Sequence, residues 1–274
     1  MSSLVGKTAL VTGSGRGIGQ QIALKLASAG ASVVVNDLDA DPAEETVSKI
    51  LADGGSAVSV VGSVLDDDFP ERFVTTAVES FGGVHIVVNN AGFTWDSVIQ
   101  KMTDEQWGTI VDLHLKAPFR VLRAVQPVIS AAVKAERTAG AVVNRKVVNI
   151  SSLAGVGGNA GQANYSAAKA GVEGLTRALS KEWGRLHVNV NAVAFGLIST
   201  RLTQSAEADA SIDVGGREIK VGVNPQLLAS MEAMIPLGRA GTPEEAAGAV
   251  YLLCTPESDY ISGQTVVCAG GFNL

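Results

Sequence analysis

The sequence has few residues of the kinds that bind metals or form disulfides: two cysteines and three histidines among 274 residues. The cysteines, Cys254 and Cys268, both lie near the C-terminus, and they are too few for a disulfide framework. The histidines are scattered and show no metal-ligand spacing. We therefore expect reduced thiols and no metal site.

Long apolar runs and an excess of positive charge are also lacking. No stretch approaches the about eighteen apolar residues of a membrane span, and the first residues, MSSLVGKTALVTG, lead into a strand-like run without an apolar signal core. The net charge of −6 argues against a surface that binds nucleic acid or anionic lipid. These absences predict a cytoplasmic protein with neither nucleic acid nor membrane as a partner.

Short runs typical of β-strands alternate along the chain with longer segments typical of helices. No linker or block of charge divides them. This pattern predicts one α/β domain over residues 1–274, a Rossmann-like doubly wound parallel sheet of about seven strands with helices on both faces. The expected strands are 8–12, 32–36, 57–61, 85–89, 146–150, 188–193 and 264–268, and the expected helices are 18–29, 43–53, 67–81, 104–136, 163–183 and 243–254.

Two segments break this alternation. Residues 201–242 contain the polar stretch DVGGREIKVGVNP and then the apolar run QLLASMEAMI. An insertion of this length between the last two expected strands predicts a loop and a helix that act as a substrate lid. The stretch KAERTAGAVVNR at 134–145 predicts an extended helix end followed by a surface loop.

A glycine-rich stretch, TGSGRGIG, follows the first expected strand and leads into a helix. Glycines at such a turn let the backbone approach a phosphate, and the helix N-terminus offers it free N–H groups. The spacing fits neither G-x-G-x-x-G nor the Walker A motif and reads T-G-x-x-x-G-x-G. A tight connection without a ligand is the alternative. The position after the first strand favours phosphate binding.

The choice of dinucleotide depends on Asp37, which ends the second expected strand in VVVNDLD. A carboxylate there accepts hydrogen bonds from both adenosine ribose hydroxyls and repels a 2′-phosphate, which favours NAD(H) over NADP(H). Two alternatives remain: Arg16 pairs with such a phosphate, or Asp39 makes the ribose contact. NADP(H) stays possible.

In NYSAAKAG, at 164–171, a phenol and an amine stand four residues apart in a helix-favouring run. Residues at this spacing share one helix face, so the ammonium of Lys169 would lower the pKa of Tyr165 and make it a usable acid or base. An ordinary surface pair of tyrosine and lysine is the alternative for this motif alone.

Four motifs occur together: TGSGRGIG, NNAG at 89–92, a serine thirteen residues before YSAAK, and NAVAFGLIST at 191–200. In this order the chain resembles the short-chain dehydrogenase/reductase family over nearly its whole length. The resemblance implies that Ser152 hydrogen-bonds the substrate oxygen, with Ser151 structural. Tyr165 then transfers a proton to or from that oxygen. Lys169 holds the nicotinamide ribose and, together with the cationic ring of the oxidised cofactor, lowers the tyrosine pKa.

The resemblance also implies a set of cofactor contacts. Asn90 would line the cleft, Ile198 would meet the carboxamide through its backbone, and Thr200 would reach the nicotinamide or the pyrophosphate. The residues expected at the cofactor are Gly13, Arg16, Gly17, Ile18, Gly19, Asp37, Ser63, Val64, Asn90, Gly92, Tyr165, Lys169, Ile198 and Thr200.

Three positions depart from the family pattern. His114, in VDLHLKAPF, stands where the family usually has a catalytic asparagine, and it is either a substitute for that residue or a histidine packed at a helix bend. Ser63 stands where an acidic or amide residue often faces the adenine, which argues against adenine recognition by its side chain. Phe195 replaces a usual proline before Gly196.

The segment FTWDSVIQKMTDEQW, at 93–107, and GQANYSAAKAG resemble the β-ketoacyl (3-oxoacyl) thioester reductase branch. This implies reduction of a 3-oxoacyl group on CoA or acyl carrier protein, or oxidation of the 3-hydroxy form, which an NAD preference favours. Alternatives are a dehydrogenase of steroids, polyols or sugars, and a non-catalytic dinucleotide sensor or scaffold. The family resemblance implies a homotetramer, with helices 104–136 and 163–183 in one contact and the C-terminal strand in another.

Overall fold

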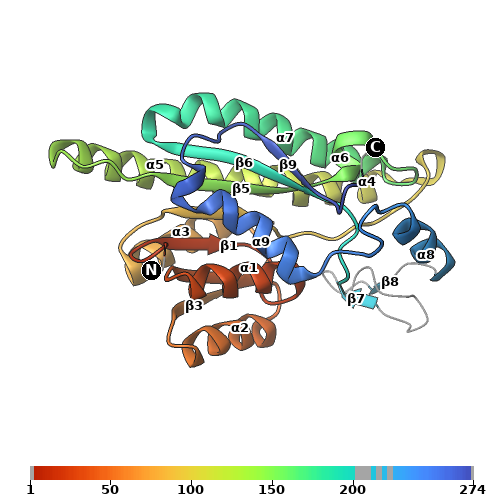
Figure 1. Ribbon diagram of the computed structural model, residues 1–274, viewed down its shortest axis with the longest axis horizontal. Helices are drawn as coiled ribbons and strands as arrows, with labels where there is room; N and C mark the ends of the chain where they lie inside the picture. Colours follow the sequence, from red (N-terminus) through yellow and green to blue (C-terminus); the bar gives the residue numbers. More distant parts are fainter. Residues whose placement is uncertain (1–2, 201–210, 214–217, 221–224, 273–274) are drawn as a thin grey trace.

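The computed structural model describes residues 3–200, 211–213, 218–220 and 225–272. Seven strands form one sheet in the order β3-β2-β1-β4-β5-β6-β9, and every neighbouring pair is parallel (Figure 1). The expectation of a doubly wound sheet of seven parallel strands is confirmed. The strands are β1 (Thr8–Val11), β2 (Ser32–Asp37), β3 (Ser56–Val61), β4 (Ile86–Asn89), β5 (Arg145–Ser152), β6 (Val188–Phe195) and β9 (Thr265–Cys268).

Helices pack on both faces of this sheet (Figure 1). Helices α1, α2 and α9 contribute to the hydrophobic cluster on one face, and α3, α5 and α7 to the cluster on the other. The helices are α1 (Gly17–Ser28), α2 (Ala40–Ala52), α3 (Phe69–Phe81), α4 (Asp104–Val111), α5 (Ala117–Thr138), α6 (Leu153–Gly157), α7 (Ala163–Trp183), α8 (Pro225–Ala233) and α9 (Pro243–Cys254).

The central strands supply side chains to both cores. Along β1, Ala9 and Val11 join one cluster and Leu10 joins the other, because successive side chains of a strand point to opposite faces. All four residues of β1 and of β4 are therefore buried. Burial of each Val or Leu side chain stabilises the folded state by about 1.5–3 kcal/mol. The sheet is therefore a stable support for the loops at its ends.

The structure departs from the sequence-based expectations at three places. The helix expected over 104–136 is instead α4, a π-helical turn over Asp112–Lys116, and α5. Strand β6 extends two residues beyond 193 to Phe195, a position in the sheet that a proline would suit poorly because it has no N–H. A short antiparallel pair, β7 (Ser211–Asp213) and β8 (Glu218–Lys220), lies within the predicted lid and was not expected.

Other expectations hold closely. Helices α7 and α9 have the predicted bounds, and a Thr–Glu capping box at Thr242 and Glu245 fixes the start of α9. Helix α5 ends at Thr138, and the next strand, β5, begins at Arg145. The segment 134–145 therefore contains a helix end and a loop, as expected. Of the predicted lid, α8 lies among the described residues, whereas 201–210, 214–217 and 221–224 lie outside them, so the lid remains a prediction.

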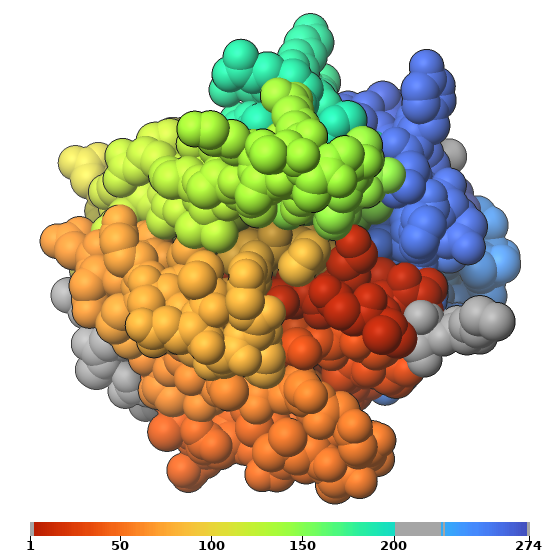
Figure 2. Space-filling view, turned by 90° about the vertical axis from the view of Figure 1, so that its left-hand side faces the viewer, coloured from red at the N-terminus to blue at the C-terminus, as the bar shows by residue number. Residues whose placement is uncertain are grey.

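The amino ends of the strands form one end of the molecule, where the N-terminal segment (red) lies beside the region of α3 and below the end of α5 (green) in Figure 2. The carboxyl ends of the strands lie at the opposite end, beside α6 and α8 (Figure 1). Among the described helices, none combines the length and the apolar character needed to cross a membrane.

Candidate active site

The strand order reverses between β1 and β4, so the connections that leave these two strands run in opposite directions and open a crevice. The glycine loop follows β1, and Asn90 to Gly92 follow β4. Ser152 ends β5 in the same sheet, and Tyr165 and Lys169 lie in the first turns of α7. The sheet therefore brings together segments more than a hundred residues apart in the chain.

The glycine loop packs too tightly for side chains. A Cβ on Gly19 would lie 2.0 Å from the carbonyl oxygen of Gly13, and one on Gly13 would lie 2.7 Å from Cα of Ala91. Gly17 has a φ of 55°, a left-handed conformation that glycine adopts without strain. Helix α1 starts after Arg16, whose side chain makes no capping bond. The N–H groups of its first turn therefore suit a pyrophosphate, and phosphate binding at this loop stays a prediction.

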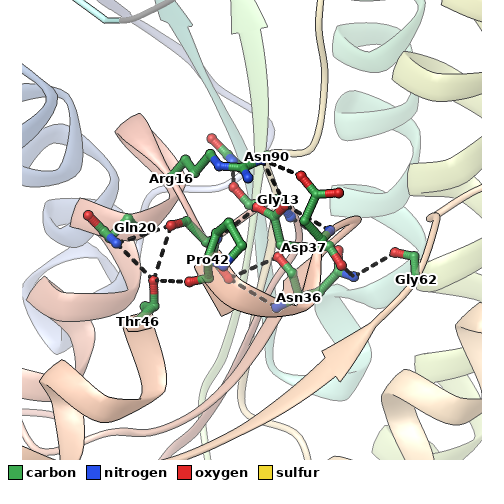
Figure 3. A network of polar contacts seen from close by, with 12 residues as sticks. Gly13, Arg16, Gln20, Asn36, Asp37, Pro42, Thr46, Gly62 and Asn90 are labelled. Atoms are coloured by element: carbon green, nitrogen blue, oxygen red, sulfur yellow. Dashed lines mark hydrogen bonds and ion pairs between the residues drawn. The ribbon is translucent and has the colours of Figure 1, made fainter. Parts of the chain in front are cut away.

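Polar contacts hold this loop between β2 and β4 (Figure 3). The amide of Asn90 donates to the carbonyl oxygens of Thr12 and Gly13, at 3.0 and 2.9 Å. Asn36 accepts a hydrogen bond from the N–H of Gly13 at 3.2 Å. Asn90 was expected to line the cofactor cleft; its side chain also braces the loop that forms the cleft.

Two carboxylates lie at the end of β2, where a dinucleotide ribose would be recognised. Asp37 accepts a hydrogen bond from the N–H of Gly15 at 3.0 Å and is almost fully buried. Arg16 forms an ion pair with Asp39 at 2.7 Å. Arg16 also lies 3.6 Å from Asp37 (Figure 3). The arginine is thus engaged by carboxylates, and the local charge does not favour an added 2′-phosphate.

Three further residues were expected at the cofactor: Ser63, Val64 and Ile18. The Ser63 hydroxyl accepts a hydrogen bond from the N–H of Leu65 at 3.1 Å, so this serine shapes the turn after β3. Val64 is buried in the core, and Ile18 packs against the core beneath α1. The roles expected for these three residues at the cofactor remain predictions.

The three expected catalytic side chains converge. Ser152 lies close enough to Tyr165 for its hydroxyl to lower the pKa of the phenol. The ammonium of Lys169 lies 5.5 Å from the centre of the Tyr165 ring and donates to the carbonyl oxygen of Ile150 at 2.6 Å. Ser151, expected to be structural, is buried and donates to Glu173 at 2.7 Å.

The acidity of the phenol differs from the expectation. Burial raises the pKa of Tyr165 to about 12, an effect that the Ser152 hydrogen bond opposes. Burial also lowers the pKa of Lys169 to about 7, so its charge is only partial at neutral pH. Among the protein's own groups, burial therefore outweighs Lys169 at the phenol; the lowering of the tyrosine pKa by Lys169 together with the oxidised cofactor stays a prediction. At neutral pH, Tyr165 carries its proton.

Comparison with known proteins agrees with this arrangement. A family model described as enoyl-(acyl carrier protein) reductase matches residues 13–273. A 3-oxoacyl-(acyl-carrier-protein) reductase of Synechocystis sp. is 38% identical over 273 residues, which cover 99% of this chain and 98% of the relative. Reductases of the same name from Vibrio cholerae and Pseudomonas aeruginosa are 36% and 38% identical, each over 99% of both chains.

The chain belongs to the short-chain dehydrogenase/reductase family. It is therefore an NAD(P)(H)-dependent oxidoreductase that acts on a CH–OH group or the corresponding ketone. The glycine loop and the uncapped start of α1 fit the dinucleotide that this family uses.

His114 is the clearest departure from the family pattern, and the structure shows how it is held. The π-helical turn carries it into the interior, where its Nε2 lies 2.7 Å from the Phe93 carbonyl oxygen and its ring meets the Tyr165 ring edge-on at 4.9 Å. A Cβ on Gly92 would lie 2.1 Å from this imidazole. Burial and Lys169 lower the pKa of His114 well below its usual value. It is a neutral imidazole that donates to Phe93.

Replacing His114 with asparagine is expected to keep most of the activity, within about tenfold, because the amide of asparagine can donate to the same carbonyl oxygen. The measurement is kcat/KM with thermal unfolding as the control for folding. A loss near a thousandfold in a folded variant would show that the imidazole itself takes part in the reaction.

Ile198 and Thr200 follow β6, as expected. Ile198 is buried and forms a parallel bridge with Gly241, and the N–H of Ser199 donates to the Gly241 carbonyl oxygen at 2.8 Å. Residue 200 is the last described residue before the gap at 201–210. The roles expected for both in binding nicotinamide remain predictions.

Sequence reasoning missed Asn164, which is fully buried and directly precedes Tyr165. Its amide donates to the carbonyl oxygens of Trp95 and Gln106, both at 3.1 Å, and its Oδ1 accepts a hydrogen bond from the N–H of Tyr165 at 2.8 Å. It thereby ties the start of α7 to the loop after β4. The only sequence signal was an amide directly before the tyrosine in an otherwise apolar helix start.

Proposed function

We propose that this enzyme reduces the ketone of a 3-oxoacyl thioester, carried by CoA or acyl carrier protein, to the 3-hydroxyacyl form. The observation that carries the proposal is the placement of two hydroxyls, Ser152 at the end of β5 and Tyr165 at the start of α7, close enough for Ser152 to lower the pKa of the phenol. The relatives named 3-oxoacyl-(acyl-carrier-protein) reductases support this substrate class.

The steps performed by the chain follow from these groups. The Ser152 hydroxyl donates a hydrogen bond to the ketone oxygen and orients it. Tyr165 then gives its proton to the same oxygen as negative charge develops there. A bound nicotinamide dinucleotide supplies the hydride to the carbonyl carbon. Because Tyr165 is protonated at neutral pH, its state suits reduction rather than oxidation.

The test is a comparison of substrates with purified enzyme, followed by the loss of reduced-nicotinamide absorbance. We expect turnover of acetoacetyl-CoA and of the acyl carrier protein thioester at a kcat/KM at least roughly tenfold above that for a panel of steroids, polyols and sugars. Preference for one of that panel would point to the alternative dehydrogenase. Dinucleotide binding with no turnover of any compound would support the non-catalytic alternative, which the complete serine, tyrosine and lysine set argues against.

The family model's description favours enoyl reduction as a second candidate. In that reaction a carbon of a carbon–carbon double bond accepts the hydride. Two hydroxyl groups that hydrogen-bond one substrate oxygen have no direct role at that carbon. Crotonyl-CoA in the same assay separates the two reactions, since ketone reduction predicts no oxidation of the dinucleotide with this substrate.

We also propose NAD(H) as the preferred dinucleotide, because the carboxylates of Asp37 and Asp39 lie together at the end of β2 and Arg16 is paired with Asp39. We expect kcat/KM for NADH to exceed that for NADPH by at least about tenfold. An Arg16→Ala variant distinguishes the alternatives. It should leave NADH use nearly unchanged, whereas a preference for NADPH that disappears in this variant would assign Arg16 to the 2′-phosphate.

We further propose that the enzyme assembles as a homotetramer. Trp107 on α4 and Phe119 on α5 are exposed, as are Leu252 on α9 and both valines of the edge strand β9. Exposed apolar side chains on helices and on an edge strand support contacts between subunits. Sedimentation velocity that finds only monomer would contradict the assembly.

A further inference from the structure

Two loops meet at the rim of the site. One follows β4 and contains Asp96; the other precedes α7 and contains Gln162. Gln162 donates to the Asp96 carboxylate at 2.7 Å, and the N–H of Ser97 donates to the carbonyl oxygen of Gly161 at 2.8 Å. Asp96 is exposed to solvent on one side, yet its position is fixed by a partner on the other loop.

The same rim is tied to the catalytic tyrosine. Asn164 donates to the carbonyl oxygen of Trp95, the neighbour of Asp96, and accepts from the N–H of Tyr165. Asp96 lies near enough to Tyr165 for its negative charge to raise the pKa of the phenol. The contacts of Gln162 and Asn164 therefore hold the loop that carries Asp96 against the start of α7, which carries Tyr165.

The cation on the other side of Tyr165 does not offset this charge. Lys169 is buried, donates to the Ile150 carbonyl oxygen, and has its pKa lowered to about 7 by burial. A substrate that carries its own carboxylate beside the reacting carbon would therefore be repelled by Asp96. Lys169, which is not fully charged, would not offset this repulsion.

We propose that Asp96 is a specificity-determining residue that excludes free 3-oxo acids, so that the enzyme takes only 3-oxoacyl groups whose carboxyl is masked as a thioester or ester. This rests on the proposed function. In a free 3-oxo acid the carboxylate is two bonds from the ketone carbon. Once the ketone oxygen is held by Ser152 and Tyr165, that carboxylate stays within a few ångströms of them and is repelled by Asp96.

The test compares acetoacetate with the neutral S-acetoacetyl thioester of N-acetylcysteamine, which share the reacting ketone and differ in charge. We expect wild-type enzyme to turn over the neutral thioester and to use acetoacetate poorly. In Asp96→Asn, kcat/KM for acetoacetate should rise about tenfold relative to that for the thioester. Asparagine can still accept the hydrogen bond from Gln162, so this variant removes the charge and keeps the contact between the loops.

Two controls separate charge from structure. Asp53→Asn makes the same change in net charge at an exposed residue that ends α2, and it should leave the ratio of the two substrates unchanged. Gln162→Leu removes the contact between the loops and keeps the Asp96 carboxylate, so discrimination should persist.

An unchanged ratio in Asp96→Asn, or equal losses on both substrates, would overturn the proposal and leave Asp96 a structural residue. If kcat/KM for acetoacetate relative to that for the thioester rises in Gln162→Leu as much as in Asp96→Asn, the effect belongs to loop position and the proposal is overturned too. Wild-type enzyme inactive on the neutral thioester would instead contradict the proposed function, and the role of Asp96 with it.

Discussion

Tyr165→Phe should reduce kcat/KM for a 3-oxoacyl thioester by about a thousandfold or more, because the variant lacks the only phenol proton placed beside Ser152. The ring itself, including its contact with His114, is retained. Steady-state kinetics measure the loss, and dinucleotide titration should show binding within a few-fold of wild type.

The matched control is Tyr260→Phe, which removes the same hydroxyl from a tyrosine that is fully exposed. Its activity should equal that of wild type. If Tyr165→Phe retained wild-type turnover, the proton would have to come from another group, and the assignment of Tyr165 would fail.

The second large effect is expected at the glycine loop. In Gly19→Ala the new methyl group would lie 2.0 Å from the Gly13 carbonyl oxygen and 2.4 Å from the Asn90 amide nitrogen, so the backbone must move. We expect dinucleotide affinity to fall by at least roughly a hundredfold, since the loop and the start of α1 no longer fit the pyrophosphate. Overpacking should also lower the free energy of unfolding by about 1–3 kcal/mol.

Isothermal titration with the dinucleotide and denaturant unfolding measure the two effects of Gly19→Ala. Gly108→Ala is the control, because Gly108 lies within α4 and a Cβ there meets no atom within 4 Å. It should keep the affinity and leave stability equal or slightly higher. Unchanged affinity in Gly19→Ala would contradict the role given to the loop.

The fold was largely predictable because its signals are local. Valine-rich runs such as IVVN and SVVVND are buried on both faces, so composition alone indicates parallel strands. The π-helical turn before α5 was not predictable, since the sequence pattern predicted one continuous helix over 104–136. Its reason lies in tertiary structure, where the turn brings His114 against Phe93 and Tyr165.

The residues of the candidate site were predicted from sequence motifs, whereas the pKa values of its side chains were not. Sequence spacing correctly paired Tyr165 with Lys169, yet the pKa of each depends on burial, which raises one and lowers the other. Asn164 and Asp96 act through partners on a loop more than fifty residues away in the chain. Such partners follow from the packing of α7 against the loop after β4, which no pattern in the sequence specifies.

The most direct test of the central claim follows the hydride itself. Reduced dinucleotide carrying deuterium at the transferring C4 position is incubated with the enzyme and a 3-oxoacyl thioester, and the product is analysed by mass spectrometry and NMR. We predict one deuterium on C3 of a 3-hydroxyacyl thioester, with the label absent from every other carbon. A product that carries no deuterium, or a saturated acyl thioester formed from an enoyl substrate in its place, would contradict the account.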